Sequence, residues 1–356
     1  LKEVPHCDTL NYYLELLSPD CLSELRKKMV TSLIRGKQFY SNRLLGKYWR
    51  VILDGTGVAC FEERHCDNCL YEKRTYKDGR KVTVYYHKVL EAKLILGDKI
   101  VVSLGTEFIE NERSDVSKQD CETKAAKRLL ERIKKEYPRL PICIQGDAMY
   151  ATEPMMEICR LNGWKYIFSH KEAQQRVLAD NYNLLSLEDG KQKVQGIGAE
   201  KGTAIYCNGI GKMAGKTETM NVYEYTCKKI IKKQEKTVHF QWITDIELTR
   251  RNLEEMVRAG RGRWKIENEG FNNQKNGIYH IQHLNSRNSN AMKNHYLLTQ
   301  IADILMQLYL AWNPIIKEIK QSIKNTSSRL LESFRRQPVT DEDVHYILRY
   351  TTIYLE

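Results

Sequence analysis

Two aspartates that each follow an apolar run are the first candidates for chemistry in this sequence. Asp54 closes the run YWRVILD and Asp147 closes PICIQGD, and small residues follow both. Carboxylates that meet a few Å apart repel each other, so one takes up a proton unless a cation lies between them. A hard ion such as Mg²⁺ satisfies both, because it prefers oxygen ligands. Either aspartate alone would indicate the start of a turn, but the pair with a third acid predicts a metal-dependent site.

The third acid lies in RGRWKIENEGFNNQKN, residues 261–276, which we predict to be helical. Residues spaced four apart on an α-helix lie along one slowly drifting stripe. Here that stripe consists of Arg263, Glu267, Phe271 and Lys275. Glu269 lies about 200° from Glu267 around the helix axis, so we expect Glu269 to face solvent. The predicted catalytic and metal-binding acids are therefore Asp54, Asp147 and Glu267.

A cysteine–histidine cluster stands apart from these acids. Most of the ten cysteines lie singly in apolar runs, which is typical of buried thiols in a reducing cytoplasm. The stretch HCDNC instead holds Cys66 and Cys69 with His65 beside them, and His87 follows in the next predicted strand. A hairpin over residues 61–80 would return His87 to the cysteines, where a structural Zn²⁺ could tie down a polar loop. Cys60 is a further candidate ligand, and two free thiols in a loop are the alternative.

Charge and composition indicate a nucleic-acid partner. The chain has 356 residues, 42% hydrophobic and 29% charged, and no apolar stretch approaches the 18 residues of a membrane span. Its net charge is +12, of which +8 lies between residues 248 and 337, with 15 Lys+Arg against 7 Asp+Glu. A concentrated basic field favours a polyanion over a merely solvated surface. Membrane-surface binding is disfavoured, because the segment is not one amphipathic helix with a lysine face.

The spacing of apolar residues predicts the elements that would position these side chains. We expect helices in the first 45 residues, then strands at 47–61, 81–96 and 99–109, with a hairpin turn at Gly97-Asp98. A helix at 121–137, a strand at 140–150, a helix at 152–163 and a strand at 164–170 follow. An antiparallel meander followed by βαβ crossovers gives a mixed five-stranded sheet flanked by helices. This is the order of a ribonuclease-H-like α/β domain.

The remaining sequence predicts an insertion inside that domain. Residues 174–246 are rich in Gly and Thr with short alternating runs, which indicates a β-rich insertion rather than a structureless loop. The predicted organisation is an N-terminal helical region (1–45), a first part of the core (46–173, with the possible zinc loop at 60–80), the insertion (174–246), the last part of the core (247–312) and a C-terminal helical tail (313–356). Because the chain begins with Leu1 rather than Met, we expect that something upstream has been removed.

The three acids, in this order of elements and with a β-rich insertion before the last, resemble the DDE transposases of bacterial insertion sequences. The branch is the one marked by Tyr-x2-Arg-x3-Glu-x6-Lys, and Arg263 and Glu267 have its spacing. Gly260 takes the Tyr position and Gln274 the Lys position, with Lys275 one residue late. The stretches LDGTGV, SKQDCETKAAKRLL, LPICIQGDAMYAT and RWKIENEGFNNQKN also resemble this group, so the resemblance covers most of residues 47–312.

This resemblance implies DNA cleavage and strand transfer with two Mg²⁺ or Mn²⁺ ions. One ion would activate a water or a DNA 3′-hydroxyl, and the other would stabilise the leaving 3′ oxygen. Arg263 and Lys275 would neutralise phosphate charge near the ions, and Arg261 and Lys265 would contact DNA beside them. The implied partner is double-stranded DNA, both element ends and target, bound by a homodimer in the bacterial cytoplasm at the nucleoid.

Two alternative functions share with a transposase either the three acids or the DNA partner. One is a ribonuclease-H-like DNA nuclease that cuts without strand transfer. The other is a domesticated, non-catalytic DNA-binding protein, which need not retain three acids. Trp164 and Trp242 could stack on an unpaired DNA base, but burial in the core is the reading that we favour for both. His280 and His283, in IYHIQHLN, have too weak a spacing to predict a metal site.

Overall fold

The computed structural model describes residues 5–211, 219–231, 234–283, 285–313, 318, 322–337 and 340–350. Two helices come first, α1 (Cys7–Leu16) and α2 (Pro19–Arg35), and the short helix η1 (Tyr40–Asn42) follows. Ser18 caps α2 by accepting a hydrogen bond from the backbone N–H of Asp20, and Gly36 follows the last helical residue. Helices thus occupy the N-terminal region where the periodicity predicts them.

One sheet contains all ten strands of the described part of the chain. The strands are β1 (Trp49–Phe61), β2 (Leu70–Thr75), β3 (Lys81–Ile95), β4 (Val101–Ile109), β5 (Ile142–Gly146), β6 (Lys165–Ser169), β7 (Gln192–Ile197), β8 (Gly202–Gly211), β9 (Thr219–Ile231) and β10 (Gln234–Thr244). Their spatial order is β2-β3-β1-β5-β6-β10-β9-β8-β7, and β4 pairs with β3. In the centre, β1 runs antiparallel to β3 and parallel to β5. The mixed sheet confirms the ribonuclease-H-like fold class.

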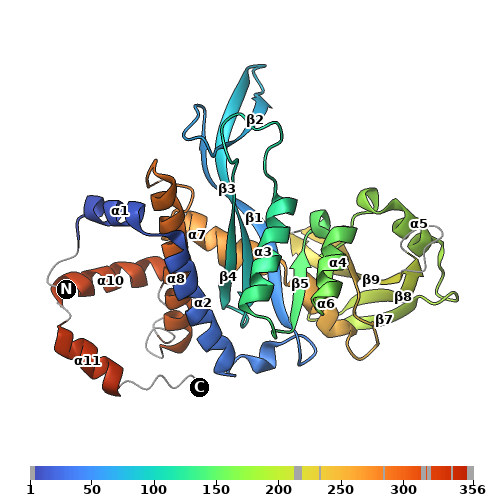
Figure 1. Ribbon diagram of the computed structural model, residues 1–356. Helices are drawn as coiled ribbons and strands as arrows, with labels where there is room; N and C mark the ends of the chain where they lie inside the picture. The colour runs from blue at the N-terminus through green and yellow to red at the C-terminus, as the bar shows by residue number, and fades with distance from the viewer. Residues whose placement is uncertain are drawn as a thin grey trace.

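The strand predicted at 47–61 is confirmed as β1, but two details of this region differ from the prediction. β1 does not end at Asp54 but continues to Phe61, because β3 pairs with it over this whole length, with one bulge between Gly57 and Ala59. The glycines after Asp54 therefore make no turn. The segment predicted as a polar loop contains β2, which pairs with the first half of β3. Together β2 and the adjoining parts of β1 and β3 form an arm that projects from the sheet (Figure 1).

Helices cover both faces of the central strands (Figure 1). α3 (Glu122–Glu136) and α4 (Glu153–Leu161) lie on one face, where Leu129 and Ile133 of α3 pack against Gly105 of β4. α2 and α8 (Ser289–Trp312) lie on the other face, and Arg26 of α2 reaches the hydroxyl groups of two β4 residues there. None of the described helices, α8 included, is both long and apolar enough to cross a membrane.

The insertion extends the core sheet instead of forming a separate one. β10 pairs antiparallel with β6, and β9, β8 and β7 continue outward from it (Figure 1). The segment also opens with the short helix η3 (Glu172–Gln174) and the helix α5 (Arg176–Leu184), which the β-rich prediction did not include. Leu178 and Tyr182 bury one side of α5 against the sheet.

The helix predicted over residues 261–276 is interrupted. α6 (Leu253–Arg261) ends before Gly262, and η4 (Ile266–Phe271) is a π-helix followed by the short α7 (Asn272–Asn276). The backbone N–H of Asn272 donates to the carbonyl of Glu267, five residues earlier, which is the hydrogen bond of a π-turn. Such turns are rare and frequently lie at functional sites. α10 (Ile323–Arg336) and α11 (Asp341–Tyr350) complete the described helices.

Four charged side chains are buried on the α8 face of the sheet: Arg26, Glu91, Lys93 and Asp303. The carboxylate of Glu91 accepts hydrogen bonds from the hydroxyl groups of Ser103 and Thr106, and both hydroxyl oxygens also accept from Arg26. The Lys93 ammonium lies 3.8 Å from Glu91 Oε2. Two positive and two negative groups therefore balance inside the protein, where an uncompensated charge would be costly.

Candidate active site

The sheet brings Asp54 and Asp147 to neighbouring positions. β1 and β5 pair in parallel from Trp49↔Ile142 to Ile52↔Gln145, and each aspartate lies two residues beyond the last of these pairs. β5 ends at Gly146 while β1 continues, so Asp147 leaves the sheet beside the middle of β1. The Asp147 side chain accepts a hydrogen bond of 2.8 Å from the backbone N–H of Met149. The register therefore places the two aspartates on neighbouring segments where β5 stops, with Asp54 itself within a strand.

The π-turn places Glu267 near Asp54. Ile266 and Phe271, five residues apart, are both buried in one cluster with Ile52 of β1 and Ile95 of β3. On a regular α-helix, residues five apart would lie about 140° from each other, so they could not share one contact surface. The π-turn aligns them, and Glu267, directly after Ile266, stands at the rim of the contact. The side chain of Glu269 lies outside the described residues, so its predicted exposure stays a prediction.

The pKa of Asp54 is shifted by its burial and by the charged groups around it. Burial raises the pKa of Asp54 to about 6, the guanidinium of Arg263 opposes this rise, and the carboxylates of Glu122 and Glu267 add to it. Arg263 also donates to Glu267, with Nη1 3.3 Å from Oε1. Arg263 thus bonds Glu267 and acts electrostatically on Asp54, and the pairing of Arg263 with Glu267 one turn apart is present.

The donor set fits a hard divalent cation. Carboxylate oxygens are the ligands that Mg²⁺ and Mn²⁺ prefer, and a buried carboxyl whose pKa is raised gains from a nearby positive charge. Asp54, Asp147 and Glu267 are therefore the candidate ligands for such a cation.

A fourth acid, Glu122, lies beside Asp54 and was not recognised in the sequence. It begins α3, forms an ion pair with Lys88 of β3, and accepts a 2.5 Å hydrogen bond from the hydroxyl of Tyr150. Gly55 makes room for it, because a Cβ at Gly55 would lie 2.3 Å from Glu122 Oε2. Glu122 thus links the strand of Asp54 to the turn that follows Asp147.

Replacing Glu122 tests this link. In Glu122→Gln the Lys88 ammonium loses its partner beside Asp54, so it should oppose the binding of a divalent cation. Two like charges at a partly buried site cost about 1 kcal/mol, and the Mg²⁺ concentration for half-maximal metal binding, measured by calorimetry, should rise about fivefold. Removing the lysine as well, in Glu122→Gln/Lys88→Met, should restore the wild-type metal requirement. An unchanged requirement in the single variant would show that Glu122 only starts α3.

The structure explains both departures from the Tyr-x2-Arg-x3-Glu-x6-Lys signature. Gly260, at the Tyr position, lies under the indole of Trp242, and a Cβ there would be 2.6 Å from Trp242 Cε2. The tryptophan of β10 therefore occupies the space that a tyrosine would need. Gln274, at the Lys position, is fully buried and donates to Gln300 and to Asp303 at 3.0 and 2.8 Å. Gln274 therefore belongs with the buried charged groups around Asp303 and is not exposed at the candidate active site.

The four predicted DNA-contacting cations have different surroundings. Arg261 makes two hydrogen bonds, of 2.8 and 2.6 Å, to the carboxylate of Glu200 in the insertion. Lys265 donates to the backbone carbonyl of Asp98 in the β3–β4 turn. Lys275 lies over the ring of Phe271, and Arg263 contacts Glu267. Arg263 is therefore the cation of this group that lies at the three acids.

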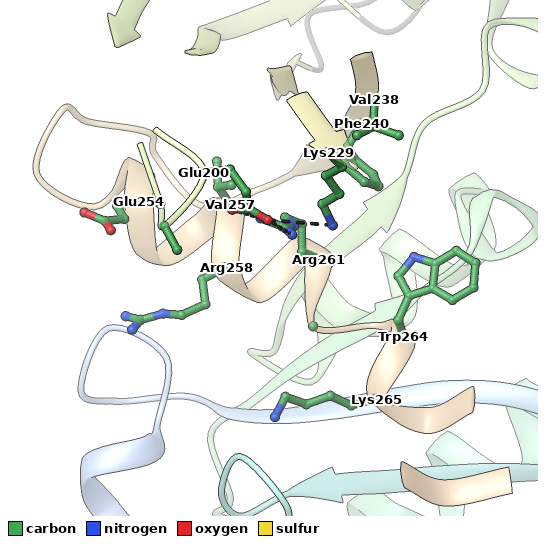
Figure 2. A pocket seen from close by; sticks show the side chains of 13 residues that line it. Glu200, Lys229, Val238, Phe240, Glu254, Val257, Arg258, Arg261, Trp264 and Lys265 are labelled. Carbon is green, nitrogen blue, oxygen red and sulfur yellow. Dashed lines mark hydrogen bonds and ion pairs between the residues drawn. The ribbon is translucent and has the colours of Figure 1, made fainter. Parts of the chain in front are cut away.

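A pocket of about 850 Å³ lies between α6 and the insertion (Figure 2). Figure 2 shows Lys229, Arg258 and Arg261 along it, together with the indole of Trp264. Trp264 is half exposed, at 50%, although it is three residues from Glu267. Sequence reasoning did not single it out. By contrast, the indoles of Trp164 and Trp242 are buried, as expected for core residues.

The cysteine–histidine residues come together in the arm. The sulfur atoms of Cys66 and Cys69 and the ring of His87 are in mutual contact, and His65 lies beside them. Cys60, the further candidate ligand, is exposed and its sulfur contacts the guanidinium of Arg74 instead. This cluster is separate from the three acids.

A comparison with protein families gives one finding over most of the chain. The family described as "Transposase DDE domain" matches residues 45–304, from just before β1 into α8. No curated protein matches the chain.

Proposed function

This chain belongs to the transposase DDE-domain family, and on that premise we propose that it cuts DNA at the ends of a mobile element and joins those ends to a target. The catalytic acids in this proposal are Asp54, Asp147 and Glu267. The observation that carries it is the parallel register of β1 and β5, which sets the two aspartates side by side. The π-turn of η4 supports it further, since Glu267 stands next to the same point and its charge raises the pKa of Asp54.

We propose that the three carboxylates hold two divalent ions, which is the scheme that the resemblance to DDE transposases implies. When bound, such ions would lower the pKa of the attacking hydroxyl and stabilise the leaving oxygen. Asp54 and Asp147 would supply ligand oxygens from fixed backbone positions. Arg263 would release Glu267 to the ions and turn its guanidinium to a phosphate oxygen, where its planar fork makes paired hydrogen bonds.

The DNA path in this proposal runs along the pocket between α6 and the insertion (Figure 2). Lys229, Arg258 and Lys265 would neutralise phosphates there. The half-exposed indole of Trp264 would stack on a base near the cut, since aromatic faces accept any base. Two element ends require two such sites, so we propose that the active form is a homodimer on paired DNA ends.

The test is cleavage of a supercoiled plasmid that carries both native element ends, with Mg²⁺ or Mn²⁺ and with EDTA. The wild-type protein should excise or join the ends only with metal, and sequencing of the joined products should show each end attached by its 3′ strand. Glu267→Gln should lose at least about a hundredfold in rate, since it removes an anionic ligand. Glu188→Gln, an exposed change in the insertion, is the matched control and should behave as wild type.

Other outcomes would support the competing functions. Metal-dependent cutting without any joined product would favour a ribonuclease-H-like nuclease. Binding of the ends without cleavage would favour a DNA-binding protein derived from a transposase. Equal activity in Glu267→Gln and wild type would remove Glu267 from the catalytic set.

A further inference from the structure

The arm formed by β1, β2 and β3 contains a cluster of sulfur and imidazole groups that has no part in the proposed catalysis. Cys66 and Cys69 lie in the turn that joins β1 to β2, and His87 lies in β3. The two sulfur atoms are 3.6 Å apart, and each is 3.4 Å from Nε2 of His87. The three atoms form a nearly equilateral triangle, and Cys69 and His87 are both buried.

These distances are those of one face of a zinc tetrahedron. With Zn–S near 2.3 Å and Zn–N near 2.0–2.1 Å, tetrahedral angles place two sulfurs about 3.8 Å apart and sulfur and nitrogen about 3.5 Å apart. A disulfide would require about 2.05 Å between the sulfurs. The chain thus holds three soft ligands at the spacing that one metal ion imposes, and the backbone N–H of Cys66 points at the Cys69 sulfur, at 3.4 Å.

His65 offers a fourth ligand on the side of Cys66 and His87, whose ligand atoms lie within 4.8 Å of its own. Its Nδ1 is buried and has no hydrogen-bond partner among the described residues, which is an unusual state for a polar atom beside a thiol and an imidazole. The ring is held by stacking on Phe61, with centroids 4.6 Å apart. Cys60 is excluded as a ligand, since its sulfur contacts Arg74 on another side.

We propose that Cys66, Cys69, His87 and His65 bind one structural Zn²⁺ in the arm. Half of the residues in the loop from Glu62 to Cys69 are exposed, and Cys69 is the buried residue among them, so the loop has little apolar core to hold it. A structural ion supplies folding free energy where a core is lacking. Four protein ligands complete the tetrahedral coordination of the ion and leave no position for a substrate, so the ion is not catalytic.

The zinc loop is connected to the acids through Asn111. The side chain of Asn111 donates to the carbonyl of Cys69, and its backbone N–H donates to the carbonyl of Asn68. Its side-chain oxygen accepts from the backbone N–H of Asp120, two residues before Glu122. The ion would thereby help to fix the segment that starts α3 beside Asp54. This inference does not depend on the proposed reaction.

Metal analysis of the purified full chain tests the site directly. Protein prepared without chelator and passed through Mg²⁺-containing buffer should retain about one zinc per chain by elemental mass spectrometry. Cys66→Ser and Cys69→Ser should each lose most of it. Cys60→Ser, a cysteine change in the same arm, should keep it. Titration with a mercurial thiol reagent should release the zinc as two thiols react, followed with a metallochromic dye.

Cobalt substitution tests the ligand set even if the serine variants fold poorly. Co²⁺ bound to the wild-type chain should show the intense visible bands of tetrahedral coordination and a sulfur-to-cobalt charge-transfer band for two thiolates. His65→Asn should keep the charge transfer but change the visible bands, because one nitrogen ligand is replaced. Absence of zinc from the wild type, with Cys66 and Cys69 either disulfide-linked or as reactive as Cys60, would overturn the proposal. An unchanged cobalt spectrum in His65→Asn would overturn the assignment of the fourth ligand.

Discussion

Asp54→Asn should abolish metal-dependent DNA cleavage and, in the absence of metal, make the protein more stable. Loss of one anionic ligand from a two-ion site is worth about 4 kcal/mol in the transition state, which corresponds to about 10³-fold in rate. The gain in stability has a separate cause. Burial raises the pKa of Asp54 to about 6 from its ordinary value of 3.8, so the folded protein resists ionising this carboxyl.

The direction in which stability changes with pH follows from the protons that Asp54 binds in the folded and unfolded chains. Between pH 3.8 and about 6 the folded chain holds a proton on Asp54 that the unfolded chain has already released. Folding is therefore favoured below this window and loses stability as the pH rises through it. A rise of about 2 pKa units corresponds to a loss of about 3 kcal/mol above pH 6. Asparagine carries no charge, so the variant escapes this loss.

Thermal melts in EDTA from pH 4.5 to 7.5 would measure the effect. The Tm of Asp54→Asn should exceed that of the wild type by about 3–6 °C at pH 7.5, and the difference should shrink towards pH 4.5. Excess Mg²⁺ should raise the Tm of the wild type more than that of the variant, because the ion binds the ionised carboxylate of the folded state. A Tm difference that is constant over this pH range would show that Asp54 does not titrate there.

Glu91→Gln should cost about 3–5 kcal/mol of folding free energy, because it leaves two buried cations with one buried anion. Arg26 and Lys93 face Glu91 from α2 and from the same strand, and Asp303 of α8 is the remaining negative group. All four are at most 5% exposed, so water cannot screen the excess. Domains are usually stable by about 5–15 kcal/mol, so this variant should be close to unfolding.

Urea unfolding would distinguish the effect of the lost charge on the free energy of unfolding from the effect of altered packing. The double variant Glu91→Gln/Lys93→Met removes one cation together with the anion, and should recover much of the free energy of unfolding lost in Glu91→Gln. Lys93→Met alone should be destabilised as well, since Glu91 then faces only Arg26. If the double variant were as unstable as the sum of the two single variants, Glu91 and Lys93 would not stabilise each other.

The sequence predicted the fold class and the main strands because their signals are local. The β-branched run around Asp54, the turn at Gly97-Asp98 and the amphipathic helix after Cys121 each carry their own pattern. The position of Asp54 inside β1, and not at the end of an apolar strand, could not be predicted in this way. Gly55-Thr56-Gly57 has the composition of a turn, but the length of β3 keeps the strand extended, and that pairing is a non-local property.

Two features of the candidate site were equally beyond the sequence. An i→i+5 turn has no distinct residue pattern, so the sequence predicted one uninterrupted helix over residues 261–276. Glu122 is one of many acids in a first helical turn, where a carboxylate is favourable for electrostatic reasons alone. Glu122 can approach Asp54 because Gly55 has no side chain. This close approach is visible only in the packing of α3 on β1.

The continuous sheet also bears on self-association. β6 contains the apolar residues Tyr166 and Phe168, and β10 pairs with its outer edge from Ser169↔Trp242 to Ile167↔Thr244. Without the insertion this short apolar edge would offer unpaired backbone groups to strands of other chains, which is a common route to aggregation.

The insertion moves the open edge of the sheet to β7, whose residues are mostly exposed and polar, with Lys193 among them and a bulge between Gln195 and Ile197. At the other end, β2 presents Lys73 and Arg74, and β4 beside it is covered by α8, whose Gln307 side chain bonds the backbone N–H and carbonyl of Val101. Short, charged and bulged outer strands discourage edge-to-edge pairing. The segment that lies beside the candidate DNA path thus also protects the nuclease-like core from forming intermolecular sheets.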